Sequence, residues 1–327
     1  MHLWFSEDVF LFLKPENFLL INNSADKVII CEDIEIWDSE TRIKVKGISL
    51  DGIMGRRVVL PKLNTNYVRF ENATASDIMY GFVEGQCINV FDSYRKIEML
   101  EVLKERFVLE RINWRATYDK LVSDVLYDVG IFSSLGYKIF ANLEDKKLLF
   151  SVARGRDLTT LQKSSPPVIF SFDYDNLGEV LYKEDNSVEK NAVYAISGNL
   201  EINEHMVYVS RDNQTTGINL KEEAFKLNAD TMEELKIEAN KKLLSLKAKK
   251  SISASILNTN SFVYEKDFDL GDVVTVVHKS AKKIMHERIT KITEVYEQGH
   301  VKLLATFGLE GKSFSQRIEN IERMVKL

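Results

Sequence analysis

The chain of 327 residues is too long for a single domain of average size, which has roughly 150 residues, so two or more domains are expected. Hydrophobic residues make up 45% of the sequence, which excludes a disordered chain and allows a sizeable core. The 44 basic and 49 acidic side chains leave a net charge of −5. This balance argues against nucleic acid as a specific partner, because phosphate binding needs clustered positive charge.

No apolar run approaches the roughly 18 residues of a membrane-spanning helix, so membrane insertion is not expected. The first residues also lack the basic start of a signal peptide. The two cysteines, Cys31 and Cys87, cannot build a disulfide framework, and Cys31 follows three apolar residues as a buried thiol would. We therefore expect synthesis in the cytoplasm with reduced thiols.

The first predicted elements are β-strands. An apolar run at 28–31 leads into the strand-like segment 34–37, and after a polar turn the residues Ile43, Val45 and Gly47 alternate with basic side chains, which predicts a hairpin with one wet face. A bend with a basic corner at Arg56 and Arg57 follows.

After residue 64 the sequence pattern predicts both helices and strands. Thr74 followed by Asp77 predicts a helix N-terminus, and apolar spacing predicts a second helix over 117–130 that ends at Gly130. The segment 136–152 reads as a hairpin. Residues 65–155 are thus predicted to form a small α+β domain.

Strands return after residue 167, and one long helix interrupts them. Thr231 and Glu234 form a capping box at its start, and its buried stripe is predicted from the spacing of five apolar residues. They are Met232, Leu235, Ala239, Leu243 and Leu246. A last helix is predicted over 313–327, where apolar residues recur at spacings of 4, 3 and 4.

No known catalytic motif is visible. The five histidines have no metal-binding spacing, and the acidic residues at 173 and 175 and at 265, 267 and 269 do not complete a calcium loop. The sequence therefore predicts no catalytic residue, cofactor site or metal site. Trp114, predicted on a loop or a helix start, is the aromatic residue best placed for a surface role.

Several stretches, taken in order and spacing, resemble one family of tail proteins. They are FSVARGRDLT at 150–159; PVIFS at 167–171 with KNAVY at 190–194; DLGDVVTV at 269–276 with RIT at 288–290 and TFG at 306–308; VKGISL at 45–50; and LGYKI at 135–139. This order is similar to that of the tail-hub proteins of siphophages and Gram-positive prophages, the ReqiPepy-type family.

The resemblance implies a β-rich α+β fold that is also similar to the central hub of phage baseplates. Two tail-tube-like β-barrels would occupy 1–64 and 156–312, with the α+β domain between them. The helix within 231–250 would be an insertion in the second barrel, and the C-terminal helix would follow it.

Such a hub is a homotrimer whose barrels form a pseudo-sixfold ring, joining the tail tube or distal tail protein to spike or fibre proteins beside the tape-measure protein. It would belong to the virion tail and be assembled in the host bacterial cytoplasm. The expected interface or junction residues are Arg56, Arg57, Arg154, Arg156, Asp157, Gly271 and Asp272. The hub of a contractile tail-like bacteriocin, a tail-associated peptidoglycan hydrolase and a host-surface binding module remain alternative interpretations.

Overall fold

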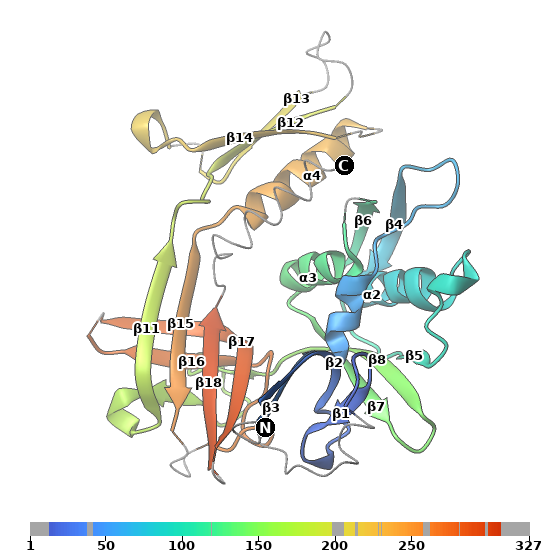
Figure 1. The fold of residues 1–327 in the computed structure, drawn as a ribbon. Helices are drawn as coiled ribbons and strands as arrows, with labels where there is room; N and C mark the ends of the chain where they lie inside the picture. The colour runs from blue at the N-terminus through green and yellow to red at the C-terminus, as the bar shows by residue number, and fades with distance from the viewer. Residues whose placement is uncertain are drawn as a thin grey trace. The chain divides into compact units, whose positions relative to one another are not determined.

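The computed structural model describes residues 13–308, with gaps at 38–41, 119, 198–205, 213–214, 228, 230, 258–261, 281 and 298–299. Two compact units are distinguished, one that ends at Gly155 and one that begins at Arg156 (Figure 1). The predicted C-terminal helix lies outside the described residues.

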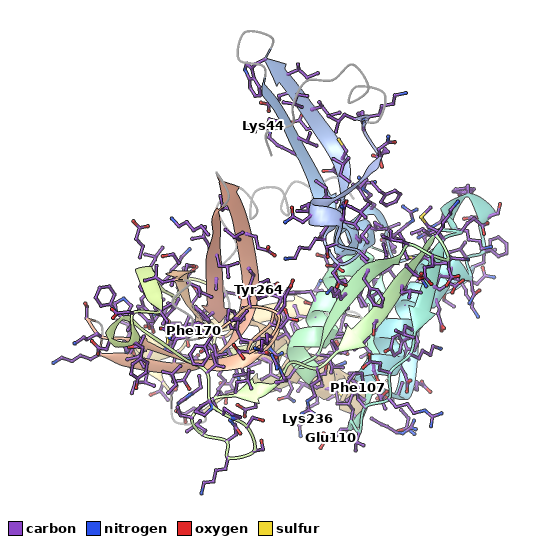
Figure 2. All side chains as sticks on the ribbon, turned by 90° about the horizontal axis from the view of Figure 1, so that it is seen from below. Lys44, Phe107, Glu110, Phe170, Lys236 and Tyr264 are labelled. Atoms are coloured by element: carbon purple, nitrogen blue, oxygen red, sulfur yellow. The ribbon has the colours of Figure 1, made fainter. Side chains whose placement is uncertain are left out.

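Unit 1 begins with an antiparallel meander of β1 (Phe18–Leu20), β2 (Val28–Trp37) and β3 (Arg42–Ser49). The predicted hairpin is confirmed, since Ile34 pairs with Val45 and Cys31 pairs with Gly47. Its wet face carries ion pairs from lysines of β3, which include Lys44 (Figure 2). The 3₁₀ helix η3 (Leu50–Arg56) follows and buries Leu50 and Met54.

The rest of unit 1 contains two helices and two small sheets. The antiparallel pair is β4–β6, and the other sheet has the order β5-β8-β7. The elements are β4 (Tyr67–Thr74), α2 (Ala75–Val83), the π-helix η4 (Glu84–Ile88), β5 (Leu100–Leu103), β6 (Arg111–Thr117), α3 (Val122–Ser133), β7 (Gly136–Asn142) and β8 (Lys147–Ala153). The predicted N-terminus at Thr74 is confirmed, because its hydroxyl accepts a hydrogen bond from the Asp77 amide.

The prediction for the second helix was wrong at both ends. Residues up to Thr117 pair with β4, so α3 starts only at Val122, and it ends where Ser134 takes a left-handed conformation with φ +58°. Gly130 lies inside the helix, and a Cβ there would stand 2.8 Å from the Leu135 carbonyl oxygen. Gly130 therefore permits a close approach rather than the stop that was predicted.

The prediction that Trp114 lies on a loop or a helix start was wrong. It belongs to β6, where it pairs with Phe70, and its ring contacts Phe132 with centroids 6.0 Å apart. It is partly buried and packs against the single core of unit 1. The strand places this side chain toward the protein, so a surface-binding role loses its main candidate.

Unit 2 is built around a seven-stranded sheet with the path β10-β16-β17-β18-β15-β11, in which β9 also pairs with β16. Its strands are β9 (Asp157–Leu158), β10 (Ile169–Ser171), β11 (Leu177–Asp185), β15 (Lys249–Ile256), β16 (Val273–His278), β17 (Lys283–Glu297) and β18 (His300–Gly308). The core centres on Phe170 (Figure 2), whose ring lies 5.1 Å from Phe268 and 5.3 Å from Phe307 between centroids.

The long strand β17 pairs with β16 through its first half and with β18 through its second half, so the sheet curls on itself (Figure 1). Asn176 ties the two sheet edges together. Its side chain accepts from the Ser171 amide and donates to the Ile169 carbonyl, while its own carbonyl accepts from Leu257. The β-rich α+β class is confirmed. Among the described strands neither unit shows a closed barrel, so the two tube-like barrels remain a prediction.

The insertion between β11 and β15 is larger than the predicted helix. It also contains β12 (Ala192–Ile196), β13 (Met206–Ser210) and β14 (Glu222–Lys226), and α4 (Met232–Ser245) covers one face of this sheet (Figure 1). The Thr231 cap is confirmed, and Leu235, Ala239 and Leu243 are buried as predicted. Met232 is exposed, because it lies in the first turn at the end of the stripe.

Candidate interface sites

Four of the seven predicted residues lie together in unit 2. Strand β9 begins at Asp157 and pairs in parallel with the start of β16, so Arg156 and Asp157 come beside Gly271 and Asp272. The pairing also lets the Val273 amide donate to the Arg156 carbonyl at 2.8 Å.

The Asp272 carboxylate is the centre of this cluster and is only 3% exposed. It accepts four hydrogen bonds: from the Arg156 amide at 2.7 Å, Arg156 Nε at 3.1 Å, Arg156 Nη2 at 2.6 Å and the Asp269 amide at 2.8 Å. The hydrogen bonds with Asp272 raise the pKa of the Arg156 guanidinium. Half of the Arg156 side chain remains exposed, so the cluster braces the fold and also presents a cation at the surface.

The two other members of the cluster have local roles. Gly271 has φ +94°, a left-handed conformation that favours glycine, and it starts the turn into β16 as the sequence predicted. Its carbonyl accepts from the Arg288 guanidinium, which holds the turn against β17. Asp157 is exposed, and a hydrogen bond from the Thr159 amide lowers the pKa of its carboxyl group.

The three other predicted residues, all of them basic, belong to unit 1. Arg56 donates to Glu16 and to Glu32, both at 2.7 Å, and so ties η3 to the meander. The Nε atom of Arg57 is buried and has no hydrogen-bond partner among the described residues. Arg154 is exposed just before the boundary between the units. The role of all seven residues at an interface or junction remains a prediction.

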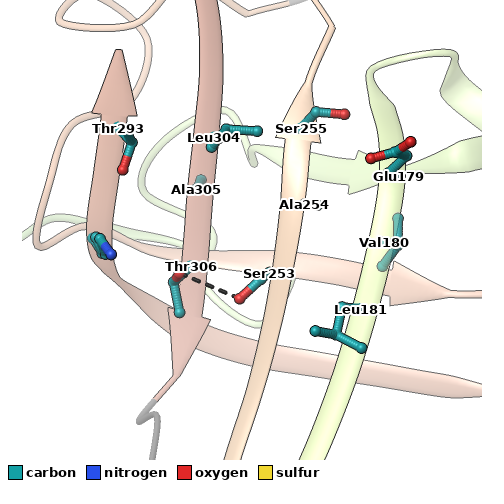
Figure 3. Close-up of a pocket in the computed structure, with 11 residues that line it drawn as sticks. Glu179, Val180, Leu181, Ser253, Ala254, Ser255, Thr293, Leu304, Ala305 and Thr306 are labelled. Carbon is teal, nitrogen blue, oxygen red and sulfur yellow. Dashed lines mark hydrogen bonds between the residues drawn. The ribbon is translucent and has the colours of Figure 1, made fainter. Parts of the chain in front are cut away.

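A hollow that the sequence analysis missed lies on the face of the main sheet away from the core (Figure 3). Its volume is about 390 Å³, and its floor consists of short side chains from β15 and β18, including Ser253, Ser255 and Thr306. The alternation of serine with apolar residues over 250–256 was the available signal, since it predicts a strand with one face of small polar side chains. We call this feature the sheet hollow.

Several of the acidic residues and histidines that were considered as metal-binding or catalytic candidates make other contacts. Asp173 pairs with Lys279 at 2.7 Å, and Asp267 accepts from the Val263 amide. His286 lies within β17, and its Nδ1 is 3.0 Å from the Thr275 hydroxyl. Among the described residues, no group of three or more potential ligands could hold a metal ion, and no helix is long and apolar enough to cross a membrane.

Two solved structures share this fold. The tail protein from Neisseria meningitidis MC58 is 14% identical, with 87% of this chain and 80% of that chain covered and a TM-score of 0.54. The 43 kDa tail protein of prophage MuSo2 from Shewanella oneidensis is 11% identical, with 94% and 88% covered and a TM-score of 0.57. No curated protein matches the sequence.

A family model described as Siphovirus ReqiPepy6 Gp37-like protein matches residues 2–309. The match includes all the motifs on which the resemblance was based, and its extent agrees with the coverage of the two solved folds. The chain therefore belongs to the Siphovirus ReqiPepy6 Gp37-like family of tail proteins.

Proposed function

We propose that the chain is a structural hub at the tip of a phage tail or in its baseplate. Three copies would form a pseudo-sixfold ring that joins the tail tube to spike or fibre proteins. The observation that carries this proposal is the family match over residues 2–309, together with a fold shared with two tail proteins. The family and the fold both support a structural role in a phage tail.

The surface of the chain suits a subunit of an assembly. Several large apolar side chains are almost fully exposed, among them Phe91 at 91%, Val108 at 100% and Ile218 at 99%. Exposed apolar side chains of this size favour contacts with other protein surfaces. The expected partners are other copies of the chain, the tail tube or distal tail protein, the tape-measure protein and the spike or fibre.

The mass of the purified protein tests the ring. Light scattering during size-exclusion chromatography should show three chains of 37.6 kDa, about 113 kDa, and electron microscopy should show a central hole. A chain that stays monomeric at every concentration would contradict a self-assembling ring. Release of fragments from peptidoglycan by the purified chain would instead favour the hydrolase.

A further inference from the structure

The face of the inserted sheet that points away from α4 carries a cluster of large apolar side chains. The residues of β12 alternate, so that Val193 and Ala195 face α4 while Tyr194 and Ile196 face away. The register places Tyr194 beside Tyr208 and Ile196 beside Met206. We call these four residues the insertion-sheet face.

These side chains are available for contact. Tyr208 is 46% exposed and Met206 is 47% exposed, and the rings of Tyr194 and Tyr208 lie 4.9 Å apart between centroids. Aromatic residues on an exposed sheet face contribute much of the energy of protein interfaces, because each buries a large area at a small entropic cost. The insertion-sheet face therefore has the composition of an interface core.

The sheet hollow has the complementary shape. Its floor of short side chains lies between two exposed leucines, Leu181 at 64% and Leu304 at 37%. Figure 3 shows Ser253 and Thr306 at the centre of the floor, joined by a hydrogen bond of 3.3 Å. A hollow with apolar edges and a floor of small residues can accept large side chains from another surface.

The charges also match. On the insertion-sheet side, Glu222 and Lys226 lie at the two ends of β14, about 13 Å apart at roughly 3.3 Å per residue. In the sheet hollow, Glu179 lies on β11 and Lys291 on β17, three strands across and two residues along, which is about 16 Å at roughly 4.8 Å per strand and 3.3 Å per residue. Each acid can therefore meet a base when the two surfaces come together.

We propose that the insertion-sheet face of one copy docks into the sheet hollow of the next copy. A face and a hollow on the same chain make a head-to-tail contact, which generates a ring when the rotation closes. In this contact Lys226 lies against Glu179 of the next copy, and Glu222 lies against Lys291. The inference rests on the proposed hub, for which it names the surfaces between subunits.

Filling the hollow tests the contact. Ser253→Trp places a large side chain on the floor at a solvent-facing position, so we expect it to shift the 113 kDa species to a single chain of 37.6 kDa. Lys163→Trp adds the same side chain to an exposed loop of unit 2 and should leave the mass unchanged. Circular dichroism of both variants controls for folding.

A charge exchange gives a second readout that misfolding cannot imitate. Glu179→Lys alone should weaken assembly at least tenfold, and Lys226→Glu in the same chain should restore it. Chains with Ala224→Cys and chains with Ser253→Cys should form cross-linked dimers with a short bis-maleimide only when mixed. The native Cys31 and Cys87 are buried and give little background.

The outcomes separate this contact from the hub itself. A wild-type monomer at every concentration overturns the ring and this contact together. A wild-type trimer whose mass survives Ser253→Trp and Glu179→Lys overturns only the contact. Cross-linking of Ala224→Cys chains without their partner would show a face-to-face pairing and would also overturn it.

Discussion

At the scale of single residues, Asp272 shows how a buried charge is made tolerable. A carboxylate removed from water is costly unless its oxygens are hydrogen-bonded, and here four N–H groups supply those bonds. The donors come from Arg156 and Asp269, so one side chain joins the start of β9 to the turn before β16. This arrangement joins the two sequence motifs that contain Arg156 and Asp272.

We predict that Asp272→Asn destabilises unit 2 by about 2–4 kcal/mol, because an amide cannot accept all the bonds from Arg156 and leaves a partly buried cation without its counter-charge. Urea unfolding followed by far-ultraviolet circular dichroism measures the change, because the three tryptophans, at positions 4, 37 and 114, all precede unit 2. Asp157→Asn is the matched control, since Asp157 is exposed, and should cost less than about 1 kcal/mol. Equal effects of the two variants would show that the cluster does not brace the fold.

Asp51 is a second carboxylate that the fold shields from water, although it is only partly buried. It lies in η3 and accepts a hydrogen bond from the Ile139 amide of β7. Burial raises the pKa of Asp51 to about 6, although the Ile139 amide and the nearby Lys138 act in the opposite direction. The folded protein therefore holds this proton more tightly than the unfolded chain, in which an aspartate has a pKa of about 3.9.

The sign of the pH effect follows from this difference. The stabilisation from protonated Asp51 is complete below about pH 4 and is lost as pH rises toward and through about 6, to a total of roughly 2–3 kcal/mol. Asp51→Asn keeps an oxygen for the Ile139 amide but cannot titrate. We expect the difference in unfolding free energy between variant and wild type to change by this amount between pH 4 and 7. A constant difference would contradict the assignment.

At the scale of elements, the sequence correctly predicted the hairpins and helix caps that depend on interactions between residues near in the chain. The β2–β3 hairpin, the Thr74 and Thr231 caps and the β7–β8 hairpin all followed from alternation or capping chemistry. The failures came where a distant strand competed. Thr117, the predicted first residue of the second helix, is instead the last residue of β6 and pairs with Tyr67 of β4, fifty residues earlier in the chain, so tertiary pairing overrode the local pattern there.

Gly47 tests how closely the meander is packed. A Cβ at this position would overlap the Ile30 carbonyl oxygen of β2, next to the register shift between Cys31 and Asp33. We expect Gly47→Ala to destabilise unit 1 by about 1–3 kcal/mol, because the backbone must move to make room. Thermal unfolding measures the effect.

Gly85 provides the matched control. It lies in η4, and a Cβ there would meet nothing within 4 Å. Gly85→Ala should therefore be neutral or stabilise the protein by up to about 1 kcal/mol, since alanine restricts the unfolded chain. A Gly47→Ala variant as stable as the Gly85→Ala variant would mean that β2 and β3 can separate without cost.

At the scale of the whole molecule, the family could be recognised from the order of motifs, but the candidate sites could not be built from it. The sheet hollow combines residues of β11, β15, β17 and β18, which are separated by up to 127 positions, and no local pattern reports which strands become neighbours. The inserted sheet was not separated from the main sheet for a related reason. Its strands have ordinary alternation, and only their pairing with one another separates them from the main sheet.

The two units have separate hydrophobic cores, and this separation has a consequence for unfolding. Phe150 is fully buried in the core of unit 1, and Phe307 is fully buried in the main core of unit 2. Cores that share no residues can melt independently. We predict two transitions in scanning calorimetry. Phe150→Ala should lower only one of them, and Phe307→Ala only the other, each by about 10 °C for a loss of about 3–5 kcal/mol.

The pair of variants distinguishes independent from coupled units. Each substitution removes the same side chain from a fully buried site, so each is the control for the other. If both transitions moved together in either variant, the units would unfold as one cooperative body. The boundary between Gly155 and Arg156 would then separate two groups of contacts, but not two units that unfold independently. Separate shifts would show that each unit folds on its own core.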